Sequence, residues 1–350
     1  MDLKREIRNT QNLWEVPKRD KEIIFYSEGK NYYPYFEGLL KELTKHGKSP
    51  IYITSDPNED RGFYIDKLLS FFMVHIDCKV FVMTLTDLNK FHLRRSMHKV
   101  HYVYIFHSPI STHMIYRFGA FDHYDSILCV GPHQINEIRK SEELYRLKPK
   151  ELVEAGYYRL EKLYEASQGH TINNQPPVIL IAPTWGPFFE SYGDSLIEIL
   201  LREGYEVILR LHPETIKRHS PSSRNGVTLE ISIVDMDSLV RSDVLITDWS
   251  GIGAKYTFGT EKPVLFIDTS PKVRNKRYKE LGIEPVEVSL RNKVGVVVSP
   301  NELDKVPEII KGLLRGRSAY KEEIIRLREK YIYNFGHSSE VGAKYIMELL

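Results

Sequence analysis

The sequence has few cysteines and almost no net charge. Its 350 residues contain only Cys78 and Cys129, which lie in or beside apolar runs, so we expect no disulfide framework and a reducing, cytoplasmic compartment. Lysine and arginine number 49 and the acidic residues 47, a balance that argues against bulk nucleic-acid binding. A preference for phosphate or anionic lipid must therefore come from local basic clusters.

Long apolar runs and a secretion signal are also missing. The chain stays polar up to its first apolar run at residue 23, so we expect the protein not to be secreted. The most apolar window, residues 68–85, is interrupted by His75, Asp77 and Lys79, whereas a spanning helix needs about 20 nearly uninterrupted apolar residues. We expect a protein that can contact a membrane surface without crossing it.

Three signatures of nucleotide and metal chemistry are absent as well. The sequence has no GxxxxGK[ST] loop, no HExxH pair and no paired-cysteine motif, which excludes simple nucleotide hydrolases and zinc sites of those types. Asp235-Met236-Asp237 matches the Asp-x-Asp pattern of metal-dependent sugar transferases. Because this segment directly precedes a predicted helix at Leu239, an acidic helix cap is the favoured interpretation. We predict neither a metal nor a cofactor.

What the sequence does have is a series of short apolar runs separated by helical patterns, which is typical of buried parallel strands in βαβ units. The runs predicted as strands are 23–26, 51–54, 80–83, 102–106, 127–130 and 152–155 in the first half, and 178–181, 207–211, 244–247 and 264–267 in the second. Predicted helices include 35–43, 134–144, 301–314, 320–333 and a segment from residue 338.

The polar segment 167–177, SQGHTINNQPP, predicts a linker between two domains. We therefore predict an α/β protein with two Rossmann-like, doubly wound parallel-sheet domains that face a cleft. The predicted domains are residues 1–170 and 171–335. A last helix over 336–350 can pack back towards the first domain.

Polar residues gather where the predicted strands end. In open α/β sheets, ligands bind beyond the carboxyl ends of the strands, so these exits are the candidate site. The exits read SEG at 27–29, HSP at 107–109, PTWG at 183–186, HP at 212–213 and DWSG at 248–251.

Two of these exits carry a histidine. His107 can act as a general base on an acceptor hydroxyl, because imidazole titrates near neutral pH, or it can merely bond a neighbouring backbone group. His212 and the preceding Arg210 can bind phosphate oxygens or serve the structure alone. The residue pattern leaves both alternatives open.

Two strand-to-helix turns are candidates for nucleotide binding. In SDVLITDWSGIG, residues 242–253, the amides around Ser250 and Gly251 begin a helix, and such an N-terminus favours a pyrophosphate. Alternatively, Ser250 is an ordinary N-cap and Asp248 a turn residue. At the other turn, which includes Thr184 and Gly186, Trp185 can stack on a base or pack a domain interface.

Two basic clusters complete the candidates. They comprise Arg94, Arg95, His98, Lys99 and His101 before the fourth predicted strand, and Lys272, Arg274, Lys276, Arg277 and Lys279 after the last one. Such clusters are either solvated surface or contacts for an anionic acceptor or membrane, at about 1 kcal/mol per basic residue.

The segments AGYYRL, APTW, RLHPE, SDVLITDWSG and KPVLFID, in this order and spacing, resemble the CDP-glycerol glycerophosphotransferases that build teichoic acids and related phosphate-linked capsules. The similarity covers most of the chain and indicates a divergent branch. The best-known members typically have HGTP where this chain has HSP at 107–109, and TDYSS where it has TDWSG at 247–251.

The resemblance implies a metal-independent transferase of the GT-B type, with a CDP-linked donor such as CDP-glycerol held mainly by the C-terminal domain. His107 would be the base on the acceptor hydroxyl, and His212 would contact the donor pyrophosphate and help CMP depart. The implied donor contacts also include Arg210, Thr184, Trp185, Gly186, Thr247, Asp248, Ser250 and Gly251. The acceptor contacts would be Glu28, Ser108, Arg94 and Arg95.

The implied acceptor is a cell-surface polymer or its lipid-linked precursor, reached from the cytoplasmic side with a peripheral contact to an anionic membrane. One alternative is a GT-B glycosyltransferase that uses a nucleotide sugar, because a fold does not fix the donor. Another is a non-catalytic protein that binds a phosphoglycan or a nucleotide.

Overall fold

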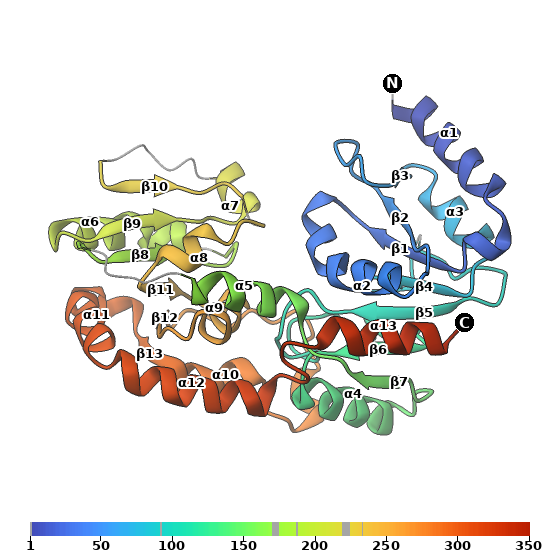
Figure 1. Ribbon diagram of the computed structural model, residues 1–350. Helices are drawn as coiled ribbons and strands as arrows, with labels where there is room; N and C mark the ends of the chain where they lie inside the picture. The colour runs from blue at the N-terminus through green and yellow to red at the C-terminus, as the bar shows by residue number, and fades with distance from the viewer. Residues whose placement is uncertain (1, 92, 170–174, 187, 219–224, 233) are drawn as a thin grey trace.

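Two parallel β-sheets organise the chain, one in each half (Figure 1). The computed structural model describes residues 2–91, 93–169, 175–186, 188–218, 225–232 and 234–350. The first sheet has the order β3-β2-β1-β4-β5-β6-β7, with β1 Ile23–Ser27, β2 Ile51–Thr54, β3 Phe63–Tyr64, β4 Val80–Met83, β5 His101–Ile105, β6 Ser126–Cys129 and β7 Glu151–Glu154. The second has the order β10-β9-β8-β11-β12-β13, with β8 Val178–Ile181, β9 Glu206–Leu209, β10 Val227–Leu229, β11 Val244–Thr247, β12 Val264–Ile267 and β13 Gly295–Val298.

Each sheet reverses its strand order once. The reversal lies between β1 and β4 in the first sheet and between β8 and β11 in the second, and both strand pairs are parallel. At such a switch point the connections leave the two strands in opposite directions, which opens a crevice at their carboxyl ends. The predicted fold class, two doubly wound parallel-sheet domains, is confirmed.

Helices cover the faces of both sheets (Figure 1). They are α1 Asp2–Glu15, α2 Tyr33–Lys45, α3 Leu69–His75, α4 Pro132–Tyr145, α5 Tyr158–Gln168, α6 Asp194–Arg202, α7 Pro213–Arg218, α8 Asp237–Arg241, α9 Ile252–Thr260, α10 Val286–Val294, α11 Val306–Arg315, α12 Arg317–Tyr331 and α13 Ser338–Glu348. Short 3-10 turns cover Lys18–Asp20, Lys30–Tyr32, Tyr278–Leu281 and Pro300–Lys305, and a π turn covers Phe189–Gly193. No helix in the described ranges is both long and apolar enough to span a bilayer.

The two halves share a hydrophobic core. The largest cluster of buried apolar residues runs from the first sheet through Tyr157 and Leu160 to Tyr256 of α9. Helix α5 follows the first sheet in sequence and packs on α9 of the second half, while α13 returns to α2 (Figure 1). Burial of a shared apolar surface holds the two sheets in one arrangement.

All ten predicted strands are present, with ends shifted by up to two residues. The predictions from the sequence did not include β3, β10 and β13, which are short strands without a long apolar run. The predicted last strand, 264–267, is followed by β13. The predicted linker 167–177 was wrong at its start, because α5 continues to Gln168. The predicted boundary between residues 170 and 171 lies outside the described residues.

Gly131 marks the point where α12 returns to the first sheet. A Cβ atom there would overlap the backbone carbonyl oxygen of Tyr331, at the end of α12. Because backbone cannot move aside cheaply, we predict that Gly131→Ala destabilises the fold by about 1–3 kcal/mol, measured as a lower Tm. Gly312→Ala is the matched control: its Cβ meets no atom within 4 Å, and alanine should keep or raise the Tm. Equal melting of Gly131→Ala and wild type would contradict this packing.

Candidate functional site

The switch point of the first sheet is bridged by a carboxyl group and a threonine. Glu28 follows β1 and Thr84 follows β4, and Thr84 Oγ1 donates a hydrogen bond to Glu28 Oε2 at 3.2 Å. Burial raises the pKa of Glu28 to about 7. A carboxyl group poised near neutral pH can accept hydrogen bonds from hydroxyl groups or exchange a proton with them.

The switch point of the second sheet has the same kind of bridge. Thr184 N donates to Asp248 Oδ1 at 2.8 Å and Thr184 Oγ1 donates to Asp248 Oδ2 at 2.6 Å. Burial raises the pKa of Asp248, although the bonds from Thr184 act in the opposite direction. Asp248 therefore joins the exits of β8 and β11, which is the role of an ordering turn residue.

The two halves of the chain meet at Ser108, beyond the end of β5, and Gly251, at the start of α9. A Cβ atom on Gly251 would overlap Ser108 Oγ and come within 3.0 Å of Ile110 Cγ2. Ser250 Oγ accepts a hydrogen bond from Ile252 N at 3.4 Å, a turn bond just before α9, whose N-cap is Gly251. The start of α9 thus lies directly against the HSP exit of β5, and glycine permits this close approach.

His107 lies in an aromatic cage beside this contact. Its ring centroid is 6.1 Å from that of Tyr32, 6.2 Å from that of Tyr35 and 6.1 Å from that of Tyr116. Its Nδ1 atom is buried and forms no hydrogen bond with any residue in the described part of the chain. The alternative of a histidine that merely bonds nearby backbone through this nitrogen therefore finds no support.

Cations from the second half disfavour the protonated form of the His107 ring. Burial, and then the charges of Lys255, Lys272 and Arg274, lower the pKa of His107 to about 4. The ring is therefore neutral at physiological pH and has a nitrogen that can accept a proton. An anion bound among these cations would offset their charge and make the ring a stronger base.

His212 and Lys272 form the cationic side of the second crevice. His212 Nδ1 accepts a hydrogen bond from Glu214 N at 3.2 Å, and burial followed by the charge of Lys272 lowers its pKa. Burial and the neighbouring Arg274 lower the pKa of Lys272 to about 8. The Lys272 ammonium lies 4.8 Å from the centroid of the Trp185 ring.

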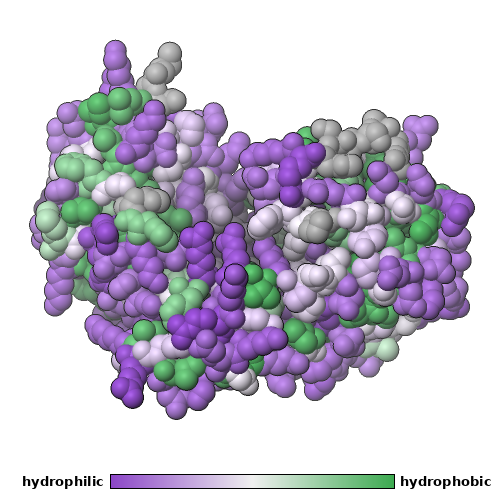
Figure 2. Space-filling view, turned by 180° about the vertical axis from the view of Figure 1, so that it is seen from behind, coloured by the Kyte–Doolittle hydropathy of each residue, from purple (hydrophilic) through white to green (hydrophobic). Residues whose placement is uncertain are grey.

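A cavity of about 500 Å³ opens beside these residues. Four predicted donor contacts line it, namely Thr184, Trp185, Gly186 and Asp248, together with Lys272, Asp268 and the segment 269–271. The Trp185 side chain is 37% exposed, so its ring is accessible to a stacking partner. This volume is in the range of small-molecule sites, and a notch between the two lobes is visible in Figure 2.

Two predicted donor contacts point into the protein instead. Thr247 is fully buried and its Oγ1 donates to the carbonyl oxygen of Ala182 at 2.7 Å. Arg210 is buried, donates to Asp235 O at 2.9 Å and lies 3.5 Å from a Glu230 carboxylate oxygen. Both side chains thus brace the second sheet.

The predicted acceptor contacts Arg94 and Arg95 lie near the amino end of β5, whereas His107 lies beyond its carboxyl end. Arg95 donates to Asp125 Oδ2 at 2.8 Å and Arg94 donates to Asn89 O at 3.3 Å. Both arginines precede β5, whereas His107 follows it, and a five-residue strand is about 16 Å long. The structure therefore does not bring these arginines together with His107.

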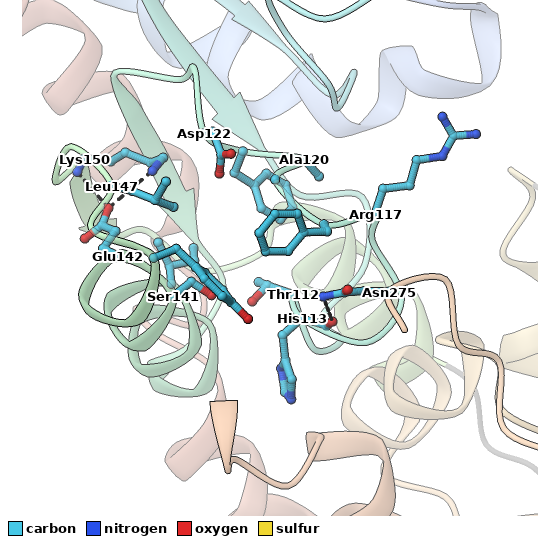
Figure 3. Close-up of a pocket in the computed structure, with 15 residues that line it drawn as sticks. Thr112, His113, Arg117, Ala120, Asp122, Ser141, Glu142, Leu147, Lys150 and Asn275 are labelled. Atoms are coloured by element: carbon cyan, nitrogen blue, oxygen red, sulfur yellow. Dashed lines mark hydrogen bonds and ion pairs between the residues drawn. The ribbon is translucent and has the colours of Figure 1, made fainter. Parts of the chain in front are cut away.

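A second, smaller cavity has a volume of about 50 Å³ (Figure 3). In it Lys150 is paired with Glu142 at 3.5 Å, and Asn275 Nδ2 donates to His113 O at 2.9 Å. It is too small for a nucleotide, and these polar groups already bond one another. The larger cavity is the better candidate for ligand binding.

Both the sequence and the structure are similar to those of known proteins. The model of the family "CDP-Glycerol:Poly(glycerophosphate) glycerophosphotransferase" matches residues 119–275, a little under half of the chain. A search of curated protein sequences found no match. The matched segment contains His212, Asp248 and Gly251, while His107 lies outside it.

The structure is similar to that of the wall teichoic acid polymerase TagF, with a TM-score of 0.65, 16% identity and coverage of 99% of this chain and 97% of that one. It is also similar to the structure of a TagF variant soaked with CDPG, with a TM-score of 0.64, 16% identity and coverage of 99% of this chain and 97% of that one. The glycosyltransferase WaaG, involved in lipopolysaccharide biosynthesis, matches with a TM-score of 0.51, 13% identity and coverage of 93% and 99%. These likenesses establish a GT-B architecture.

The charge of Lys272 lowers the pKa of both His107 and His212, which predicts a measurable change in their titration when it is removed. Because the charge of Lys272 disfavours protonated imidazole, we expect Lys272→Met to raise the pKa of both His107 and His212. The pKa values are measured by NMR titration of the histidine ring protons. Lys276→Met, at an exposed lysine in the same segment, should leave both pKa values unchanged. Unaltered titration in Lys272→Met would show that this lysine does not face the histidines.

Proposed function

We propose, on the premise that residues 119–275 of this chain belong to the CDP-glycerol:poly(glycerophosphate) glycerophosphotransferase family, that the protein is a CDP-glycerol glycerophosphotransferase-like enzyme. It would transfer glycerol phosphate, or another alditol phosphate, from a CDP-linked donor to a hydroxyl of a cell-surface polymer or its lipid-linked precursor. The observation that carries this proposal is the close contact between the HSP exit of β5, which includes His107, and the start of α9, beside a cavity of about 500 Å³ at the exits of β8 and β11.

The donor would bind to the second half of the chain. The exposed Trp185 ring offers a stacking surface for the cytosine base inside the cavity of about 500 Å³. Lys272 and the amides that begin α9 at Gly251 provide positive charge for the diphosphate. His212, whose Nδ1 accepts from Glu214 N, would offer its ring N–H at Nε2 as a hydrogen-bond donor. Asp248 would keep this turn in place through its bonds to Thr184.

The transfer would be one in-line displacement at the phosphorus that carries glycerol. The acceptor hydroxyl oxygen forms a new P–O bond, and the bond from this phosphorus to the bridging oxygen of CMP breaks, leaving its electron pair on CMP. The hydroxyl proton passes to His107, while His212 and Lys272 offset the charge that develops on departing CMP. Positioning and charge stabilisation supply the rate, and no covalent enzyme intermediate is needed.

The acceptor would approach from the first half of the chain. Glu28 lies at the switch point of that sheet, and its carboxyl group can accept hydrogen bonds from the hydroxyls of an alditol. Ser108 packs against Gly251, so it defines the floor between donor and acceptor.

A nucleotide-sugar glycosyltransferase is the second candidate, because WaaG has the same fold and fold does not determine the donor. The nucleotide released distinguishes the two. CMP from CDP-glycerol supports the first proposal, while release of UDP or GDP from a nucleotide sugar supports the second.

Membrane contact would involve α1 in place of the predicted Arg94 cluster. Leu3, Ile7 and Trp14 are exposed along one side of α1, flanked by Lys4 and Arg8, and Figure 2 shows hydrophobic surface around this end of the molecule. An apolar stripe beside basic residues is typical of helices that lie in an anionic membrane surface.

For the membrane contact, we expect Leu3→Asp with Ile7→Asp to abolish binding to vesicles that contain anionic phospholipid, measured by co-sedimentation. Ile231→Asp is the matched control, since Ile231 is 71% exposed in the other half of the chain, and it should bind like wild type. Equal binding of all three proteins would rule out α1 as the membrane contact.

For the donor site, we expect His212→Ala to lower kcat/KM for CDP-glycerol at least about 10-fold, because one charge-assisted contact of about 1.4 kcal/mol is lost. The assay measures CMP release in the presence of acceptor. His46→Ala, at an exposed histidine after α2, should turn over normally. Unchanged kinetics in His212→Ala would remove this residue from the site.

A further inference from the structure

A basic segment of the second half lies on the first half of the chain. It covers residues 268–285, which join β12 to α10. Lys272 in this segment lines the cavity of about 500 Å³, whereas the backbone amides of Arg274 and Asn275 donate to Met114 O at 3.0 and 3.2 Å. Met114 belongs to the loop after β5. The basic segment thus connects the cavity to this loop.

Asn275 is the central residue of this contact. It is only 7% exposed, although Arg274 and Lys276 on either side of it are exposed. Its Nδ2 atom donates to His113 O at 2.9 Å, a bond drawn in Figure 3, and its Oδ1 atom accepts from Arg277 N at 3.0 Å. One end of the amide therefore closes a local turn, while the other end holds the loop after β5.

The loop after β5, residues 107–114, is itself fixed on the first half. Glu137 of α4 accepts from the backbone nitrogen and from the hydroxyl group of Thr112, at 2.5 and 2.6 Å. The His113 ring lies between the two halves, with Nδ1 3.2 Å from the Glu137 carboxylate and Nε2 3.0 Å from Ile283 O in the basic segment. The loop is thus anchored both to α4 and to the basic segment.

Further contacts hold the middle and the end of the basic segment. Ser111 of the loop donates through its backbone nitrogen and its hydroxyl group to the carboxylate of Glu287, just beyond the segment, at 3.0 and 2.5 Å. The Arg277 guanidinium carbon lies 4.3 Å from the centroid of the Phe118 ring and 4.7 Å from that of Tyr145. Arg277 therefore contacts the first half, which accounts for one residue of the basic cluster without a ligand.

The basic segment carries two cations that act on His107. The charges of Lys272 and Arg274 lower the pKa of His107, after burial and Lys255. Asn275 follows Arg274 directly and lies three residues beyond Lys272, a separation that an extended chain spans with at most about 11 Å. A shift of Asn275 on the loop would therefore move both cations relative to the His107 ring.

We propose that Asn275 is a positioning residue for the transfer, because its bonds to the loop after β5 hold Lys272 at a fixed distance from His107. The inference rests on the proposed function, in which Lys272 offsets charge on departing CMP and His107 takes the proton of the acceptor hydroxyl. These two groups come from different halves of the chain and act in the same step, so their spacing matters. Asn275 does not line the cavity of about 500 Å³, and we therefore expect it to act through Lys272.

Two neutral substitutions separate this role from that of the local turn. Asn275→Ser keeps an oxygen that can accept from Arg277 N but is too short to reach His113 O, whereas Asn275→Ala removes both bonds. Asn136→Ala, at an exposed asparagine of α4, is the control and should match wild type. The pKa of His107 is measured by NMR titration without substrate, and kcat/KM for CDP-glycerol is measured as CMP release. Both are measured at a temperature where thermal unfolding shows each variant to be folded.

We expect both Asn275→Ser and Asn275→Ala to raise the pKa of His107 and to lower kcat/KM at least about fivefold, the effect of one lost hydrogen bond. In a Lys272→Met background the same substitutions should change kcat/KM less than about twofold, because the lysine through which they act is gone. A wild-type pKa of His107 or wild-type kinetics in Asn275→Ser, or an undiminished loss in the Lys272→Met background, would overturn the inference.

Amide exchange in the wild type tests the contact without any variant. The amides of Arg274 and Asn275, which donate to Met114 O, should exchange at least about 100-fold more slowly than the amide of the exposed Lys276. Equal exchange would likewise overturn the inference. If the wild type releases no CMP from CDP-glycerol, the proposed donor is refuted, while a raised pKa of His107 in both Asn275 variants would still support Asn275 as the anchor of the two cations.

Discussion

The close contact between Ser108 and Gly251 is the constraint on which the site depends. It brings the exit of β5 in the first sheet against the start of α9 in the second, and a side chain at residue 251 would force Ser108 Oγ and Ile110 to shift. The contact brings together two crevices that are each braced by a threonine and a carboxyl group, Thr84 with Glu28 and Thr184 with Asp248. Chemistry that needs groups from both sheets becomes possible at this junction.

The rest of the fold holds that contact in place. Helix α5 extends from the first half onto α9, α12 returns to the beginning of α4, and α13 packs on α2. Ser111 Oγ of the first half also donates to the part-buried Glu287 carboxylate of α10. At this junction burial and then the charges of Lys255, Lys272 and Arg274 lower the pKa of the half-buried His107, a combination that suits binding a phosphate beside a base.

Much of the fold was predictable because buried parallel strands leave uninterrupted apolar runs, and all ten such runs form strands. The strand-exit rule also placed His107, Thr184 and Asp248 just beyond strand ends, where the structure has them, while their roles in binding and catalysis stay predictions. The same rule argues against Arg94 and Arg95, since residues that precede a strand lie at its amino end, opposite the ligand edge. Period-two alternation likewise explains Thr247, whose side chain faces Ala182 inside the sheet.

The sequence could not predict which helices of the two halves contact each other. Lys255 is one helical turn beyond Gly251, so its proximity to the start of α9 could have been inferred from the sequence. Tyr35 lies far from Tyr157 and Arg159 in the sequence, and nothing in their local sequence shows that they meet. Edge strands such as β10 also escaped notice, because Thr228 and Leu229 are exposed and the run is only three residues long.

The most direct test of the account is a structure of the protein with CDP-glycerol bound. The account predicts the cytosine in the cavity beside Trp185, the diphosphate between Lys272, His212 and the start of α9, and the glycerol-bearing phosphorus on the side that faces His107. A nucleotide bound elsewhere, or one whose glycerol phosphate points away from His107, would contradict it.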